Sequence, residues 1–195
     1  MNIRNIIFLI TFIIIGSTIF ISSCSNKVTI NEKKFTPLES FYNLKAKTID
    51  GEIISMSQFK GKKILIVNVA SECGYTPQYE SLQKLYDTNK DDLHILAFPS
   101  NDFLNQEPGT SSEIKKFCRV NFGVKFDIFE KVSVTGQNAH PIYEWLSNKK
   151  LNGWSGQKPT WNFNKYLIDE NGYLIGYWAS AIDPLSSTIL DKITN

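Results

Sequence analysis

A single cysteine, Cys73, lies between an apolar run and a helical pattern, and this arrangement constrains the fold more than any other feature. Residues 63–70 are almost entirely β-branched or aliphatic, which predicts a strand buried on both faces. Residues 78–86 carry apolar side chains at helical spacing. Thr76 is the expected N-cap, and Pro77 suits the first helical position. The chain is therefore predicted to form a strand–turn–helix unit with Cys73 in the turn.

The position of Cys73 favours a reactive thiol. Backbone N–H groups and the positive end of the helix dipole favour the thiolate at such a turn. The third residue after Cys73 is Thr76, so the Cys-x-x-Cys motif of dithiol exchangers is absent. A lone nucleophile here is typical of a cysteine that reacts with peroxides or thiols. The alternative is an inert thiol that packs as a small hydrophobe, and the local context leaves both open.

The first 23 residues have the layout of a secretory signal peptide, with one basic residue, a long apolar run and small residues at the end. The segment that ends at Cys24 resembles the lipobox of bacterial lipoproteins, with Ile21 in place of the usual leucine. This resemblance implies cleavage before Cys24 and lipidation of its thiol. The alternative is an uncleaved membrane anchor. Both predict an exported, membrane-anchored domain on the periplasmic or extracytoplasmic face, joined by a polar tether over residues 24–37.

Net charge and cysteine content limit which partners and which redox chemistry the chain can have. A net charge of +2 is too small to indicate a nucleic-acid partner. With Cys24 assigned to lipid, Cys73 and Cys118 remain, and an oxidising compartment would allow a static or a catalytic disulfide between them. The turn context of Cys73 favours the catalytic one. His94 and His140 lack partners at metal-ligand spacing and are interpreted as structural, so neither a metal nor another cofactor is expected.

The remaining patterns alternate between strand and helix. They predict, in order, a hairpin around Asp50-Gly51, a buried strand at 93–98, a helix capped by Ser111 or Ser112 that carries Cys118, an extended segment at 126–134, a helix at 139–149, a hairpin at 164–178 and a closing helix at 184–193. This order predicts an α/β domain over residues 38–195, with a central mixed β-sheet flanked by helices in a thioredoxin-like fold.

Four sequence blocks resemble the signatures of the glutathione peroxidase family. They are Asn-Val-Ala-Ser-Glu-Cys-Gly-Tyr-Thr at 68–76, Phe-Pro-Ser-Asn at 98–101, Gln-Glu-Pro-Gly at 106–109 and Trp-Asn-Phe-Asn-Lys-Tyr-Leu-Ile at 161–168. The blocks follow the order and spacing of the family over roughly residues 38–194. The resemblance implies a peroxidase that reduces hydrogen peroxide and organic or lipid hydroperoxides.

The family's catalytic tetrad corresponds to Cys73, Gln106, Trp161 and Asn162. In the implied reaction the thiolate attacks a peroxide oxygen and becomes a sulfenic acid, and water or an alcohol leaves. The three partners are neutral N–H donors that can hold thiolate and peroxide in line as charge develops. Taken singly, they could be a solvated loop residue, a core aromatic and a turn former. Their joint spacing with Cys73 favours the catalytic interpretation.

Cys118 stands where the two-cysteine branch of the family carries its resolving cysteine. That branch resembles thioredoxin-dependent peroxidases, which implies a Cys73–Cys118 disulfide reduced by a thioredoxin-like protein, with glutathione or another thiol as the alternative reductant. Because Cys118 lies on a predicted helix, the disulfide would require that helix to open locally. The alternative for Cys118 is a buried helical thiol.

The chain departs from the family pattern in three places. Ser100 stands where many members have a cysteine, which removes an alternative resolving partner. Asp102 replaces a glutamine and puts a charge beside the active-site loop, without an evident role. The segment before Trp161 lacks the longer insertion of tetrameric relatives, so a monomer is expected.

Two other functions use parts of the same pattern. A peroxide-sensing redox relay would use Cys73 and Cys118 to pass a disulfide to a client protein. A metal-binding or assembly lipoprotein with a thioredoxin fold would need Cys-x-x-x-Cys and a distant histidine, but Thr76 and Pro77 occupy the place of the second cysteine.

Overall fold

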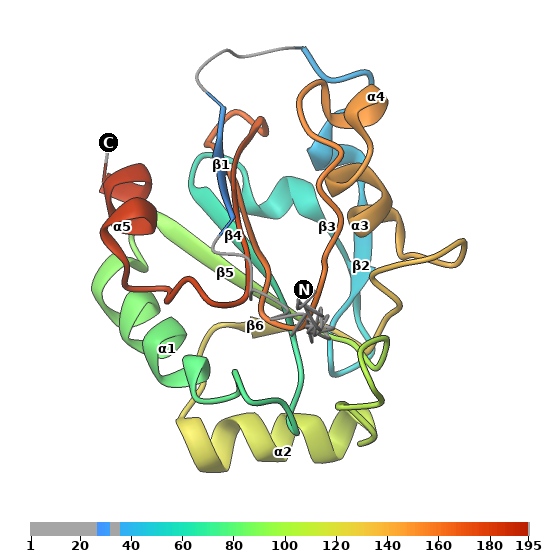
Figure 1. The fold of residues 1–195 in the computed structure, drawn as a ribbon, viewed down its shortest axis with the longest axis vertical. Helices are drawn as coiled ribbons and strands as arrows, with labels where there is room; N and C mark the ends of the chain where they lie inside the picture. Colours follow the sequence, from blue (N-terminus) through green and yellow to red (C-terminus); the bar gives the residue numbers. More distant parts are fainter. Residues whose placement is uncertain (1–26, 32–35, 195) are drawn as a thin grey trace, which may run out of the picture.

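The computed structural model describes residues 27–31 and 36–194, which build one six-stranded mixed sheet and a small separate hairpin (Figure 1). The sheet has the order β1-β8-β7-β4-β5-β6. Its strands are β1 (Val28–Ile30), β4 (Lys63–Val69), β5 (Leu93–Pro99), β6 (Asp127–Ile128), β7 (Lys165–Ile168) and β8 (Leu174–Trp178). Strand β4 runs parallel to β5 and antiparallel to β7, so the predicted mixed sheet is confirmed.

Helices cover both faces of this sheet (Figure 1). One face packs against α1 (Gln78–Asn89), α2 (Ser111–Phe122) and α5 (Ser187–Thr194). The other packs against α3 (Pro141–Leu146), α4 (Lys149–Asn152) and the 3-10 turns η1 (Phe41–Asn43) and η2 (Met56–Phe59). All seven residues of β4 are buried, because alternate side chains enter the two hydrophobic clusters on opposite faces.

The predicted hairpin around Asp50-Gly51 is present as β2 (Lys45–Lys47) and β3 (Ile53–Ser55). Gly51 has a φ of 90°, which only glycine adopts without strain. This hairpin forms its own two-stranded sheet, and a bridge from Thr48 to Phe129 places it beside the segment that follows β6.

Outside the cysteine loop, some local predictions differ from the structure. The expected tether contains strand β1, which pairs antiparallel with β8 at the edge of the sheet. The cap of α2 is Thr110, one residue earlier than predicted, since Glu113 completes a capping box with it. The single helix expected at 139–149 is two short helices, because the Asn148 side chain accepts from the Lys150 N–H and starts α4.

The signal segment 1–23 and the lipidation site Cys24 lie outside the described residues. Within 27–31 and 36–194, no helix is both long and apolar enough to cross a membrane.

Candidate active site

Cys73 lies in the loop between β4 and α1, and its side chain is almost fully buried. The Tyr75 N–H donates to Cys73 Sγ over 3.4 Å, which gives the sulfur one backbone donor. The Thr76 hydroxyl accepts from the Cys73 N–H over 3.0 Å and donates to the Ala70 carbonyl over 2.8 Å. The predicted N-cap role of Thr76 is therefore wrong, because its hydroxyl closes the cysteine loop. The N-cap position of α1 is Pro77, which has no side-chain cap bond.

Gln106 and Asn162 are hydrogen bonded to one another. The Asn162 Nδ2 donates to Gln106 Oε1 over 3.0 Å, and Asn162 is fully buried. Because the amide oxygen of Gln106 accepts this bond, its NH2 group is available to other acceptors. The backbone N–H of Glu72 donates to the Gln106 carbonyl over 2.9 Å. The structure thus brings Gln106 and Asn162 together and joins them to the loop that carries Cys73.

The segment that contains Trp161 and Asn162 is held by Asn68, a buried polar residue in β4. The Asn68 side chain donates to the Trp161 carbonyl over 2.9 Å and accepts from the Asn164 N–H over 3.1 Å. The Asn68 carbonyl also accepts from the Phe163 N–H. We did not predict this role for Asn68 from the sequence, although an asparagine inside an apolar strand was the available signal.

The loop before Gln106 is shaped by three polar side chains. Leu104 and Asn105 both have a left-handed backbone, with φ of 54° and 55°. Asn101 donates to Asn105 Oδ1 over 3.2 Å and accepts from the Glu107 N–H over 2.8 Å, so it spans this bend. Asp102 accepts from the N–H groups of residues 134 and 135 over 2.6 and 2.9 Å. The charge that had no evident role in the sequence therefore anchors the Gln106 loop to a neighbouring segment.

Trp161 packs against Phe103 of the same loop, with ring centroids 5.7 Å apart. The Trp161 side chain is half-buried, whereas its neighbours Asn162 and Phe163 are fully buried. Phe163 has a φ of 61°, and the hydrogen bonds between Asn68 and residues 161, 163 and 164 hold this uncommon backbone. The four residues of the expected tetrad therefore come from three loops that are joined to each other.

Cys118 lies on α2, as predicted, and is fully buried. Cys73 and Cys118 belong to the same hydrophobic cluster and are both free thiols. Burial raises the pKa of Cys118 to about 11; the neighbouring Tyr79 hydroxyl lowers this pKa, and the charge of Glu107 raises it. In the resting structure Cys118 is therefore a protonated thiol.

The two histidines have packing roles. The ring of His94 contacts Phe59, with centroids 4.9 Å apart. His140 caps α3, since its Nδ1 accepts from the Ile142 N–H over 3.2 Å. The part of the chain that the structure describes holds no group of three or more His, Cys, Asp or Glu side chains suited to a metal ion.

Comparison with known proteins agrees with this architecture. The family model described as glutathione peroxidase matches residues 41–147. The chain is 47% identical over 146 residues to the glutathione peroxidase of Lactococcus lactis subsp. cremoris, which covers 74% of this chain and 92% of that protein. It is 46% identical over 150 residues to the glutathione peroxidase-like peroxiredoxin 2 of Saccharomyces cerevisiae, covering 75% and 91%.

Among solved structures, the apo form of Trgpx superposes with a TM-score of 0.62 at 37% identity, covering 80% of this chain and 93% of that one. The thioredoxin-like fold expected from the order of elements is confirmed by this match and by the mixed sheet flanked by helices. On sequence, coverage and fold together, this chain belongs to the glutathione peroxidase family.

Proposed function

We propose that this protein is a thiol peroxidase in which Cys73 reduces hydrogen peroxide and organic hydroperoxides, lipid hydroperoxides among them. The observation that carries the proposal is the bond between Asn162 and Gln106, held beside the Cys73 loop by the Glu72–Gln106 backbone bond. The peroxidase names of the relatives at 46–47% identity support the same chemistry.

In the first step the Cys73 thiolate attacks one peroxide oxygen. The S–O bond forms as the O–O bond breaks, and the departing oxygen takes a proton to leave as water or an alcohol. Gln106, Trp161 and Asn162 are neutral and offer N–H donors, so they can stabilise the charge on the departing oxygen without opposing the thiolate. A carboxylate in the same place would disfavour the anionic sulfur.

In the second step Cys118 attacks the sulfenic acid of Cys73. The new S–S bond displaces hydroxide, which leaves as water with the proton of the Cys118 thiol. Two cysteines form a disulfide only when their α-carbons lie within about 7 Å. Cys118 is buried on α2, and its pKa of about 11 makes it a poor nucleophile there. We therefore propose that α2 opens locally before this step.

A thioredoxin-like protein or glutathione completes the proposed cycle by thiol–disulfide exchange. One relative at 46% identity is named as a peroxiredoxin and another as a glutathione peroxidase, which supports a thiol reductant of either kind. Both names describe peroxidases, so the comparisons do not support the redox relay weighed from the sequence.

We also propose that the protein is exported and anchored by lipid on Cys24, as a monomer. The support is the signal-like segment 1–23 and the lipobox-like residues before Cys24. Intact mass of the membrane fraction tests this: a diacylglycerol-modified chain that begins at Cys24 is expected, and Cys24→Ser should remove both the modification and the cleavage. Size-exclusion chromatography with light scattering tests the monomer.

The catalytic cycle is tested by peroxide consumption of residues 25–195, with thioredoxin plus its reductase or with glutathione. Wild type should turn over. Cys73→Ser should be inactive, and Cys118→Ser should react once and then stall when thioredoxin is the reductant. Normal turnover of Cys118→Ser would show that an external thiol resolves the sulfenic acid. Failure of the wild type to consume peroxide would overturn the peroxidase proposal.

A further inference from the structure

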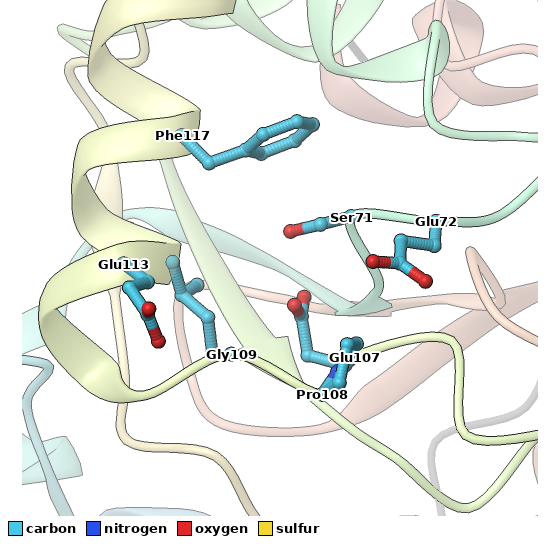
Figure 2. A pocket seen from close by; sticks show the side chains of 8 residues that line it. Ser71, Glu72, Glu107, Pro108, Gly109, Glu113 and Phe117 are labelled. Carbon is cyan, nitrogen blue, oxygen red and sulfur yellow. The ribbon is translucent and has the colours of Figure 1, made fainter.

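A cavity of about 470 Å³ lies between α2, the cysteine loop and the loop that follows Gln106 (Figure 2). Ser71 borders it on the side of the cysteine loop, and Ile114 and Phe117 border it from α2. The carboxylate of Glu107 points from its loop into this space (Figure 2). The cavity therefore lies in the interface between α2 and the active-site loops, where α2 would separate from them.

Among the residues that line this cavity, Glu107 is unusual. Its side chain is only 1% exposed, and neither carboxylate oxygen has a partner at full hydrogen-bond geometry, although the Ser71 hydroxyl and backbone N–H lie close enough to act on it as weak donors. Burial raises the pKa of Glu107 to about 7, although Ser71 and Lys131 act in the opposite direction. The Lys131 ammonium is engaged elsewhere, since it donates to the backbone carbonyls of residues 107, 108 and 109. The Ser71 donors only partly offset the cost of burying a carboxylate, since the pKa of Glu107 still lies near 7.

The charged and titratable groups around Glu107 come from every element that packs there. Glu72 on the cysteine loop raises the pKa of Glu107 further, and Glu113 on α2 borders the same cavity. On the inner side, the charge of Glu107 raises the pKa of Cys118 and that of Tyr79. Apart from Lys131, these neighbours are acids or neutral groups, so separation of α2 would relieve an ionised Glu107 by admitting water.

We propose that Glu107 is a positioning residue for the disulfide step: its ionised carboxylate weakens the packing of α2 against the cysteine loop and so promotes the opening that lets Cys118 reach Cys73. Glu107 acts through the helix and does not touch the reacting sulfurs. This inference rests on the proposed two-cysteine cycle.

The direction of the pH dependence follows from proton binding. A glutamate exposed by opening has its ordinary pKa of about 4.5, whereas the closed structure holds Glu107 at about 7. Between these values the closed form binds more protons, so its stability is full below about pH 4.5 and is lost as pH rises to about 7. The open population therefore grows over this range and then levels off. Glu107→Gln cannot ionise and should keep α2 closed at every pH.

The experiment uses the intact protein as wild type, Glu107→Gln and the matched control Glu113→Gln. Glu113 borders the same cavity, but its exposed carboxylate has a lowered pKa and stays ionised from pH 5 to 8, and glutamine can replace it in the capping box. Hydrogen exchange of the α2 amides in the reduced protein measures opening. Stopped-flow traces after one equivalent of hydrogen peroxide measure sulfenic acid and disulfide formation separately.

At pH 8 we expect Glu107→Gln to lower both α2 opening and the disulfide rate by roughly two orders of magnitude, and at pH 5 by only about fourfold. Glu113→Gln should keep the pH profile of the wild type. Equal opening and disulfide rates of wild type and Glu107→Gln at pH 8 would overturn the role of Glu107 and leave the two-cysteine cycle intact.

Three further outcomes would contradict this proposal or the two-cysteine cycle on which it rests. An equal loss of sulfenic acid and disulfide formation in Glu107→Gln would overturn the proposal, because it would indicate damage to the adjacent Gln106. A lower melting temperature of Glu107→Gln than of wild type at pH 8 would contradict it as well, since removal of an unpaired buried charge should stabilise the closed fold. Absence of any disulfide in the wild type would instead overturn the resolving role of Cys118.

Discussion

The Nδ2 atom of Asn162 donates a hydrogen bond to Oε1 of Gln106 over 3.0 Å, and so joins two loops that lie 56 residues apart in the chain. Neither loop is next to Cys73 in sequence, yet the Glu72 N–H holds the Gln106 carbonyl 2.9 Å away. The bond fixes the orientation of the Gln106 amide, because its oxygen is already engaged. Gln106 and Asn162 should therefore act as one unit.

This coupling predicts non-additive kinetics. Gln106→Ala and Asn162→Ala should each lower kcat/KM for hydrogen peroxide by roughly a hundredfold, as for loss of one transition-state donor. The double variant should lose little more than either single one, because each change already leaves the other amide misoriented. Stopped-flow rates of Cys73 oxidation for the four proteins give the coupling. Losses that multiply would show that the two amides act independently.

The hydroxyl of Thr76 is predicted to hold the loop that carries Cys73 in its reactive conformation, and not to cap α1. Thr76→Val removes a group that bonds both the Cys73 N–H and the Ala70 carbonyl, and it leaves two buried backbone groups unpaired. The free energy of unfolding should fall by about 1–3 kcal/mol, and the rate of Cys73 with peroxide should fall as well. Thr76→Ser keeps the hydroxyl and should retain the rate. Urea unfolding and stopped-flow oxidation measure the two effects, and unchanged values for Thr76→Val would contradict this role.

Asn68 is predicted to support the site from inside the sheet. Asn68→Ala removes the donor to the Trp161 carbonyl and the acceptor of the Asn164 N–H, in a fully buried position. We expect a loss of about 2–4 kcal/mol in unfolding free energy and a larger loss of peroxidase activity than of folded protein. Asn171→Ala, in an exposed turn, is the control and should change stability by less than about 0.5 kcal/mol. A variant of Asn68 with normal activity would show that the Trp161 segment holds itself in place.

The features that were predicted from sequence depend on short-range chemistry. The buried run of β4, the turn at Cys73 and the pattern of α1 are each readable within about ten residues. The Asp50-Gly51 hairpin is equally local, because its turn needs a positive φ that glycine supplies. Family resemblance then identified Gln106, Trp161 and Asn162 as a group, which no local pattern could do.

The features that were missed depend on contacts between distant segments. Strand β1 has three residues and forms only because β8 offers an edge to pair with. Asn68 and Glu107 are polar residues whose roles depend on the segments that pack over them. Asn68 bonds to Trp161, 93 positions later in the chain, and Glu107 shares its cavity with Phe117, 10 positions later. The Thr76 hydroxyl was expected to cap the helix, but it bonds to Cys73 and Ala70 instead, because the geometry of the loop brings these backbone groups to it.

The burial of Lys165 is predicted to make the stability of the fold depend on pH. Its side chain is fully buried in β7, and its ammonium donates to Gln78 Oε1 and to the carbonyls of Ser180 and Ile182. Burial lowers the pKa of Lys165 to about 7, and Asp183 only partly opposes this. The unfolded chain holds the lysine proton up to about pH 10.5, so between pH 7 and 10.5 unfolding takes up a proton and stability rises with pH.

Between pH 7.5 and 9 the wild type should therefore gain up to about 1 kcal/mol per pH unit from Lys165. Lys165→Met keeps the volume, cannot titrate and leaves three acceptors without their donor, so it should be less stable at pH 7 and lack this gain. The difference in unfolding free energy between the two proteins, measured in urea at several pH values, isolates Lys165 from all other groups. A difference that stays constant across this range would show that Lys165 remains charged inside the fold, with its three acceptors outweighing the cost of burial.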